Sequence, residues 1–226
     1  MKLATDVRAA SLPPTMQLNP SIARSVSLSA IILLLLGCGN GEEEYNKAMQ
    51  IANKTWGNPH LGNDTKYEAI ELFAIAADKG HADAQYQLGV AYRNGIATRE
   101  NHEKSAEYFQ QAAEQGHPLA KTSFAYFLLR GIGVPKDIEK ASKLFHETAA
   151  YGDPGAHEEL GRMYFEGEGV EKDIVEAYKW TFMATRSMTQ FEAPALLRKL
   201  KEQITPEQLT EAEKSIKEWK PKPIEK

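Results

Sequence analysis

The chain has 226 residues, of which 42% are hydrophobic and 26% are charged, values that are typical of a folded globular protein rather than a disordered one. Its formal net charge of −4 offers no basic excess with which to hold nucleic acid. Its single cysteine excludes an intrachain disulfide bond. The composition therefore favours one domain or a short repeat array.

The first predicted element is a targeting segment at residues 1–37. Residues 28–36 (LSAIILLLL) form an apolar run that is too short to cross a bilayer as a helix, which needs about 20 residues. The run has the length of a signal-peptide core, and Arg24 places a positive charge before it. Because the stretch before the run is long, the true start of translation is open between Met1 and Met16.

The apolar run ends in Leu-Leu-Gly-Cys at residues 35–38, which resembles the lipobox of bacterial lipoproteins. That resemblance implies cleavage before Cys38, acylation of its thiol and a lipid anchor on the periplasmic side of the envelope. Gly39 does not resemble the Asp that retains many lipoproteins at the inner membrane, so the outer membrane is favoured. Residues 38–44 then form the lipidated cysteine and a short hydrophilic tether. The alternative is a buried Cys38 in an ordinary helix.

A period of 36 residues organises the rest of the chain. It separates the members of three sets of positions: Gly80, Gly116 and Gly152; Gly95, Gly131 and Gly167; and Asn101, Asp137 and Asp173. Self-similarity at a fixed step is the signature of a repeat architecture. The period defines three units at residues 80–115, 116–151 and 152–187, and a degenerate helix pair at residues 45–79 precedes them.

Each unit is predicted to contain two helices. In the first, Ala84, Leu88 and Tyr92 recur every four residues and form one apolar stripe. A glycine then supplies a left-handed C-cap, and an aspartate in the second and third units offers its side chain to the free N–H groups of the next helix. The small residues Gly89 and Gly161 predict a close approach of the paired helices. The sequence thus predicts an all-α solenoid of tandem helix–turn–helix repeats.

Residues 188–219 are predicted to hold two C-terminal capping helices. Thr205 and Gln208 form a capping box with Pro206 at the first helical position. The tail, residues 220–226 (KPKPIEK), is charged and interrupted by prolines, so it is predicted to be disordered.

Three motifs recur within the units: Ala-x-Ala-x-x-x-Leu-Gly at residues 82–89, Gly-x-Gly-Val at residues 131–134 and 167–170, and Lys-Asp at residues 136–137 and 172–173. Together they resemble the Sel1-like repeat family, a relative of the tetratricopeptide repeats. The resemblance implies a right-handed superhelix of α-hairpins that acts as an adaptor or scaffold. Some lipoproteins of the family are thought to be immunity proteins against phospholipase toxins, and a branch with paired cysteines has been described as β-lactamase-like.

The sequence lacks a set of catalytic residues. His146 and His157 are each followed by Glu, as in a zinc-protease helix, but that motif needs a second histidine four residues further on, where Ala150 and Gly161 stand. Gly-x-Ser-x-Gly and Ser-x-x-Lys do not occur, and no cysteine pair follows Cys38. We therefore predict a protein that is not an enzyme, that needs no cofactor or metal, and whose partner is another protein.

The predicted protein-binding face lies opposite the apolar stripe of the first helices, as a helical wheel at 100° per residue places it. Its candidate residues are Tyr86, Val90, Arg93, Tyr126, Leu129, Arg162 and Phe165. Tyr and Arg are enriched in interface hot spots, whereas a solvated face carries Lys, Glu and Gln. The alternative is that neighbouring units or the C-terminal helices cover some of these residues.

The sequence therefore predicts an envelope lipoprotein that binds a protein. Two non-catalytic roles fit, an immunity protein against a secreted phospholipase-type toxin or a scaffold in an envelope assembly. A hydrolase of cell-wall material or of β-lactams is the alternative from another class.

The lipid anchor gives the first prediction. Cells that express the wild-type chain should incorporate a labelled fatty acid into it, and Cys38→Ala should abolish the incorporation because only a thiol at this position can enter the acylation reaction. Metabolic labelling followed by gel analysis measures the difference. Equal labelling of both chains would contradict the lipobox.

Overall fold

The computed structural model describes residues 39–56, 63–186 and 193–223. The chain divides into two compact units, Met1–Gly39 and Asn40–Lys226. The predicted leader and Cys38 lie outside the described residues, so the structure leaves both predictions open. Within the described residues every regular element is an α-helix, and no helix is long and apolar enough to cross a membrane.

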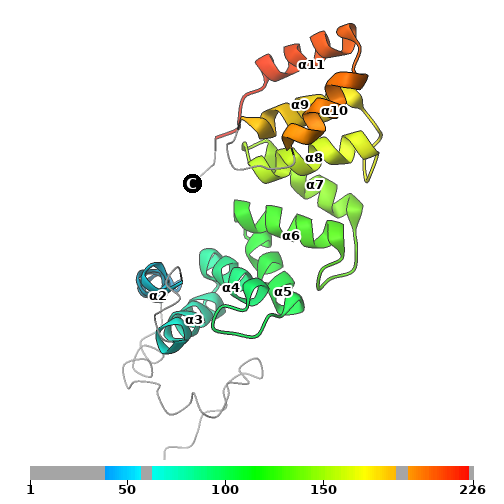
Figure 1. Cartoon of the computed structure of the whole chain (residues 1–226). Helices are drawn as coiled ribbons and strands as arrows, with labels where there is room; N and C mark the ends of the chain where they lie inside the picture. Colours follow the sequence, from blue (N-terminus) through cyan, green and yellow to red (C-terminus); the bar gives the residue numbers. More distant parts are fainter. Residues whose placement is uncertain (1–38, 57–62, 187–192, 224–226) are drawn as a thin grey trace, which may run out of the picture. The chain divides into compact units, whose positions relative to one another are not determined.

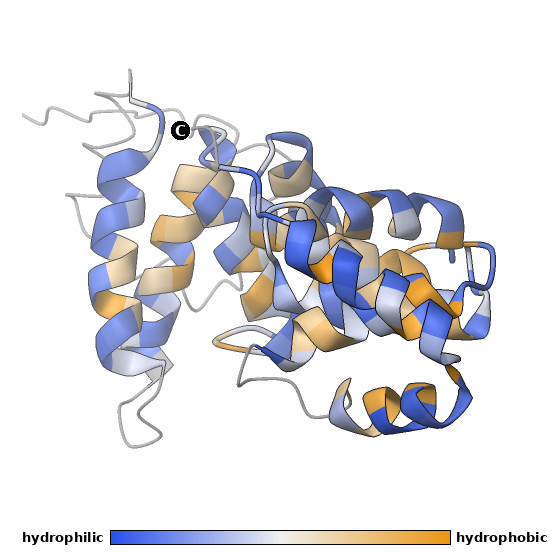
Figure 2. Cartoon of the chain, turned by 90° about the horizontal axis from the view of Figure 1, so that it is seen from above, coloured by the Kyte–Doolittle hydropathy of each residue, from blue (hydrophilic) through white to orange (hydrophobic). Residues whose placement is uncertain are grey.

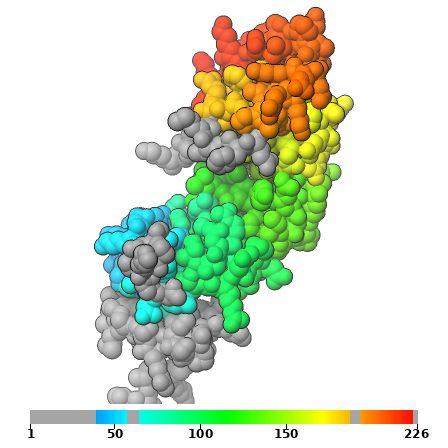
Figure 3. Space-filling model, viewed as in Figure 1, coloured from blue at the N-terminus to red at the C-terminus, as the bar shows by residue number. Residues whose placement is uncertain are grey.

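The helices of the second unit follow one another in pairs. The first pair is α2 (Glu42–Thr55) and α3 (Asn63–Asp78), and three further pairs are α4 (Ala82–Asn94) with α5 (His102–Glu114), α6 (Pro118–Arg130) with α7 (Ile138–Ala149), and α8 (Pro154–Glu166) with α9 (Ile174–Thr185). The first helices of these three pairs start at residues 82, 118 and 154, so the predicted 36-residue step is confirmed. Within the array, each helix packs against the helices before and after it in the chain (Figures 1 and 3).

One turn geometry joins the two helices of every repeat. The glycine after each first helix adopts a left-handed conformation, with φ of 64° at Gly95, 67° at Gly131 and 75° at Gly167. Six residues later, a side-chain oxygen caps the second helix: Asp137 Oδ1 accepts a hydrogen bond from the N–H of Lys140 at 2.9 Å. The glycine C-caps and the aspartate N-caps were both predicted from the sequence, and both are confirmed.

The first of the three turns departs from the family pattern without changing conformation. Ala97 stands where the later units carry Gly133 and Gly169, and its φ of 51° makes it the one non-glycine residue with positive φ among the described residues. An alanine in this region costs roughly 1–2 kcal/mol relative to glycine. The surrounding helix pair therefore imposes the turn even where the local sequence opposes it.

Small residues let the two helices of a unit approach closely. A Cβ on Gly89 would lie 2.6 Å from the Phe109 ring, and a Cβ on Gly161 would lie 2.9 Å from the backbone nitrogen of Thr181. Both distances are shorter than atoms tolerate, so only glycine allows the second helix to pack here. The predicted role of these glycines in close packing is confirmed.

Hydrophobic and hydrophilic residues alternate along the helices, as the colouring by hydropathy shows (Figure 2). Buried residues form one core between α2 and α4, a central core from α5 to α9, and a third core between α9 and the C-terminal helices α10 (Ala193–Gln203) and α11 (Pro206–Glu218). The unit that starts at Asn40 thus holds all three cores. Both capping helices were predicted, and the capping box at Thr205 and Gln208 is present.

Residues 220–223 of the C-terminal tail follow a defined path, contrary to the prediction of disorder for them, and residues 224–226 lie outside the described residues. The backbone N–H of Lys222 donates to the carbonyl oxygen of Ala150 at 2.8 Å, and Pro221 lies beside Gly152. Trp219 packs edge-on against His157, with ring centroids 5.5 Å apart. Composition alone predicts a disordered tail. It contains no information on the packing of Trp219 against His157 or on the hydrogen bond from Lys222 to Ala150.

The close approach at Gly161 gives the second prediction. Gly161→Ala should destabilise the soluble chain 39–226 by about 1–3 kcal/mol, because the new methyl group must displace the backbone of α9. Gly155→Ala, six residues earlier in the same helix, is the matched control. Its Cβ would lie 3.3 Å from Asp153 Oδ1, which caps the helix, and 3.6 Å from the Thr122 methyl group. No backbone atom of another helix has to move, so we expect a smaller change, within about 1 kcal/mol of zero. Urea unfolding followed by circular dichroism measures both, and equal stability of the two variants would contradict the packing argument.

Candidate protein-binding surface

The exposed side of the first helices is a narrow stripe, because each of these helices has neighbours on two sides. On one side lies its own second helix, and on the other lies the preceding or following unit. In α6 the stripe consists of Leu119, Ser123, Tyr126 and Arg130, spaced three to four residues apart. It is rotated by roughly 60° from the predicted face, at 100° per residue. The predicted residues therefore divide between the surface and the contacts between units.

Tyr86 belongs to the contact between the first and second units. Its ring stacks on the imidazole of His117, with centroids 4.7 Å apart and planes 19° apart, and it lies 5.7 Å from the ring of Phe109. Val90 is also half-buried and packs against the central core. Both residues contribute to the joint between units, as the alternative interpretation of the predicted face anticipated.

His117 links this joint to the start of α6. Its Nδ1 accepts a hydrogen bond from the N–H of Ala120 at 3.1 Å, and its Nε2 lies 3.2 Å from Asp83 Oδ1. Burial lowers the pKa of His117, although Asp83 opposes this shift. The imidazole therefore acts as the N-cap of α6 and has a structural role.

Leu129 is buried, with 1% of its surface exposed, so its prediction as a binding residue is wrong. It belongs to the central core together with Phe127 and Leu128. The helical wheel placed it outside because the wheel considers one helix with one buried side. In α6, packing from two directions buries three consecutive residues.

Arg93, Arg162 and Phe165 are held by neighbours within the chain. The Arg93 side chain is exposed, and its guanidinium lies 5.9 Å from the centroid of the buried Phe109 ring. The ring of Phe165 is half-buried against the C-terminal core, and the ammonium of Lys172 lies 5.5 Å from its centroid. Neither arrangement leaves a free aromatic ring for a partner.

Arg162 is surrounded by carboxylates. It pairs with Glu159, with Glu166 at 3.3 Å and with Glu168 at 3.4 Å. Burial alone would lower the pKa of the guanidinium, but the three carboxylates outweigh burial and raise it. The exposed stripe of the third unit is therefore acidic, with one internally neutralised arginine.

Tyr126 is the predicted residue that the structure leaves most available. Its side chain is 41% exposed, and the guanidinium of Arg130 lies 5.5 Å from its ring centroid. Leu119, two helical turns earlier on the same stripe, is 51% exposed and was missed by the sequence analysis. It could have been found from its position seven residues before Tyr126, which places both on one helix face. Leu119, Ser123, Tyr126 and Arg130 are called the α6 stripe below.

The histidines and acidic residues of the described ranges were candidates for a metal site. No group of three or more His, Cys, Asp or Glu side chains there could hold a metal ion. His146 bonds through Nε2 to the hydroxyl of Tyr164 at 2.9 Å, and His157 bonds through Nε2 to the carbonyl oxygen of Ala149 at 3.1 Å. The two histidines that begin like a zinc-protease motif thus take part in packing between helices.

The chain belongs to the Sel1 repeat family, whose sequence model matches residues 61–81, 82–117, 119–153 and 154–186. Its fold is similar to that of a Sel1 repeat protein from Oxalobacter formigenes, with 24% identity and a TM-score of 0.60, covering 78% of this chain and 71% of that one. It is also similar to c5321, a protective antigen present in uropathogenic Escherichia coli strains that displays an SLR fold, with 22% identity and a TM-score of 0.55, covering 80% and 45% of the two chains. A comparison with curated proteins found no match.

These comparisons confirm the predicted family and the all-α solenoid fold. The first of the four matched segments begins in the degenerate helix pair, which is therefore a divergent repeat. Sel1 repeat proteins mediate protein–protein interactions and generally act as non-catalytic scaffolds. Membership of this family therefore indicates that the chain binds another protein.

Proposed function

We propose that this chain is an envelope lipoprotein that binds a protein partner through the α6 stripe. The observation that carries the proposal is the exposure of Leu119 and Tyr126, at 51% and 41%, on one face of a helix in the middle of the array. Large apolar side chains that are half-exposed and two helical turns apart provide the centre of a contact, and Arg130 adds the residue type that is enriched in hot spots. The lipobox at Cys38 supports an envelope location.

The surfaces on the two sides of the α6 stripe differ in charge. On the side of the third unit lie Glu159, Glu166 and Glu168, and Arg162 and Lys136 neutralise part of their charge. On the side of the first unit lie Arg93 and Asp83. A partner that fits would place apolar side chains over the α6 stripe and basic side chains towards the third unit, because complementary charges fix the orientation of a complex.

The more specific role that we propose is that of an immunity protein for a phospholipase-type toxin. Its support is the combination of a lipobox with Sel1 repeats, which resembles lipoproteins thought to have that role. If a neighbouring gene encodes a lipase-like effector, the purified chain should inhibit that enzyme at a one-to-one ratio. Failure to inhibit, with retention of another envelope partner, would favour the scaffold role instead.

The α6 stripe gives the third prediction. In a pull-down from envelope extracts, Leu119→Ala and Tyr126→Ala should each weaken capture of the partner by about 1–3 kcal/mol in binding free energy, as truncation of hot-spot residues does. The matched control is Tyr67→Ala on α3, where the side chain is 37% exposed but lies off the stripe. Quantitative binding to the recovered partner measures the difference, and circular dichroism should show equal helicity in all variants. Unchanged binding of both stripe variants would place the contact elsewhere.

A further inference from the structure

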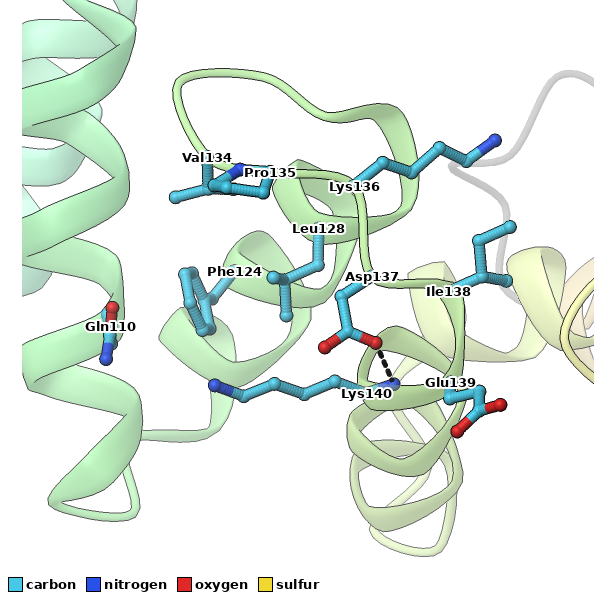
Figure 4. Close-up of a pocket in the computed structure, with 10 residues that line it drawn as sticks. All are labelled: Gln110, Phe124, Leu128, Val134, Pro135, Lys136, Asp137, Ile138, Glu139 and Lys140. Atoms are coloured by element: carbon cyan, nitrogen blue, oxygen red, sulfur yellow. Dashed lines mark hydrogen bonds between the residues drawn. The ribbon is translucent and has the colours of Figure 1, made fainter.

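An open groove of about 660 Å³ lies beside the second unit, between α5, α6 and the start of α7 (Figure 4). Gln110 faces it from α5, Phe124 and Leu128 form its floor on α6, and Lys140 extends across it from α7. The groove lies on the side of α6 that carries residues 124 and 128, away from the α6 stripe. It therefore forms a site distinct from the stripe.

The repeat itself shows why the groove exists. The position of Leu128 is occupied by Tyr92 in the unit before and by Tyr164 in the unit after. In the third unit the hydroxyl of Tyr164 reaches back to the second helix of the preceding pair and bonds to His146 Nε2 at 2.9 Å. The equivalent of His146 in the first unit is Gln110, which lines the groove. The third unit thus has a tyrosine at the position that the second unit fills with Leu128, which is 5% exposed at the floor of the groove.

In the first unit, a lysine on the second helix covers the tyrosine ring of the first helix. The ammonium of Lys104 lies 5.3 Å from the ring centroid of Tyr92, and the ring also stacks on Tyr108. The equivalent of Lys104 is Lys140, whose ammonium lies 5.2 Å from the ring centroid of Phe124. A cation over an aromatic face is a favourable contact. The second unit therefore retains the cation of this arrangement but lacks the tyrosine at position 128.

In the second unit the aromatic residue stands four residues earlier in the first helix than in the other units, at position 124 instead of position 128. Phe124 stands where the other units have Leu88 and Leu160, and it is 3% exposed, in the central core. Leu128 is shorter than tyrosine and has no hydroxyl, so it cannot bond to Gln110, which donates to Glu114 Oε1 at 2.8 Å. The exchange keeps the core filled and leaves a recess for an aromatic hydroxyl group at its edge.

We propose that this groove receives a tyrosine side chain of the partner protein. The ring would lie on Leu128 and beneath Lys140, and its hydroxyl would donate to the amide oxygen of Gln110. The choice of occupant follows from the two flanking units, which fill the same place with their own tyrosines. The inference rests on the proposed function only in taking the partner to be a protein.

The direct test uses p-cresol, the side chain of tyrosine as a free molecule, and the isotope-labelled chain 39–226, which holds all three cores. We expect p-cresol to shift the amide NMR signals of residues that line the groove, with a dissociation constant on the order of 1–10 mM for a ligand of this size. Toluene, which lacks the hydroxyl, should bind at least threefold more weakly. Absence of shifts at the groove, or equal binding of toluene, would overturn the proposal.

Two variants with opposite expected effects control the test. The double variant Leu128→Tyr with Gln110→His places the residues of the third unit in the groove, and it should weaken p-cresol binding there at least tenfold. Tyr164→Leu should open a recess at the same position of the third unit, where Glu176 replaces Lys140, and create a second, weaker p-cresol site beside His146. Because these variants act at separate repeats, misfolding of one does not remove the other from the test. Unchanged p-cresol binding to a folded double variant, or no new site in folded Tyr164→Leu, would contradict the assignment.

The partner, once recovered, separates this inference from the proposed function. Loss of binding in the Leu128→Tyr and Gln110→His variant, with the Leu119 and Tyr126 variants unaffected, would support the groove and contradict the stripe. The reverse result would support the stripe and overturn the groove as a partner site. The p-cresol measurement needs no partner, so the two proposals fail independently.

Discussion

In each of the three units between residues 80 and 187, the backbone N–H of the residue that caps the second helix donates to a carbonyl oxygen in the last turn of the first helix. The distances are 2.9 Å from Asn101 to Tyr92, 3.0 Å from Asp137 to Leu128 and 3.0 Å from Asp173 to Tyr164. This bond closes a turn that begins at a left-handed glycine, and it fixes the direction in which the second helix leaves. Because it recurs unchanged, each unit presents the same two faces to its neighbours. The remaining structure, from the cores to the exposed stripe, depends on that repetition.

Local chemistry made most of the fold predictable from the sequence. The helix ends could be placed from residues that favour one backbone conformation or one capping hydrogen bond. These are the glycines at positions 95, 131 and 167 and the aspartates at positions 137 and 173. Burial was harder to predict, because it depends on two neighbours that a helical wheel does not include. Leu129 is buried for that reason. The docking of the tail on Ala150 depends on the position of a distant turn, which no local pattern reveals.

Function in such an array lies in the positions where one unit departs from the others. The exposed Leu119 stands where the first unit has Asp83 and the third has Gly155, and Leu128 stands where both have tyrosine. Both departures fall on α6, on opposite sides of the helix. The shared scaffold keeps α6 in place while these side chains vary, since the turn uses only the backbone carbonyl of Leu128, and the caps do not use the side chain at either position. The second unit is therefore where we place recognition.

The central claim is that each 36-residue unit contacts only its neighbours and carries its own turns. Deletion of residues 116–151 joins Gln115 to Gly152 and restores a left-handed glycine, a cap and a first helix at the junction, whereas deletion of residues 116–133 removes a first helix and its turn. Urea unfolding of both chains by circular dichroism is the most direct measurement. The account predicts a cooperative transition with undiminished helicity per residue for the first chain and loss of both for the second. Equal collapse of the two chains would contradict it.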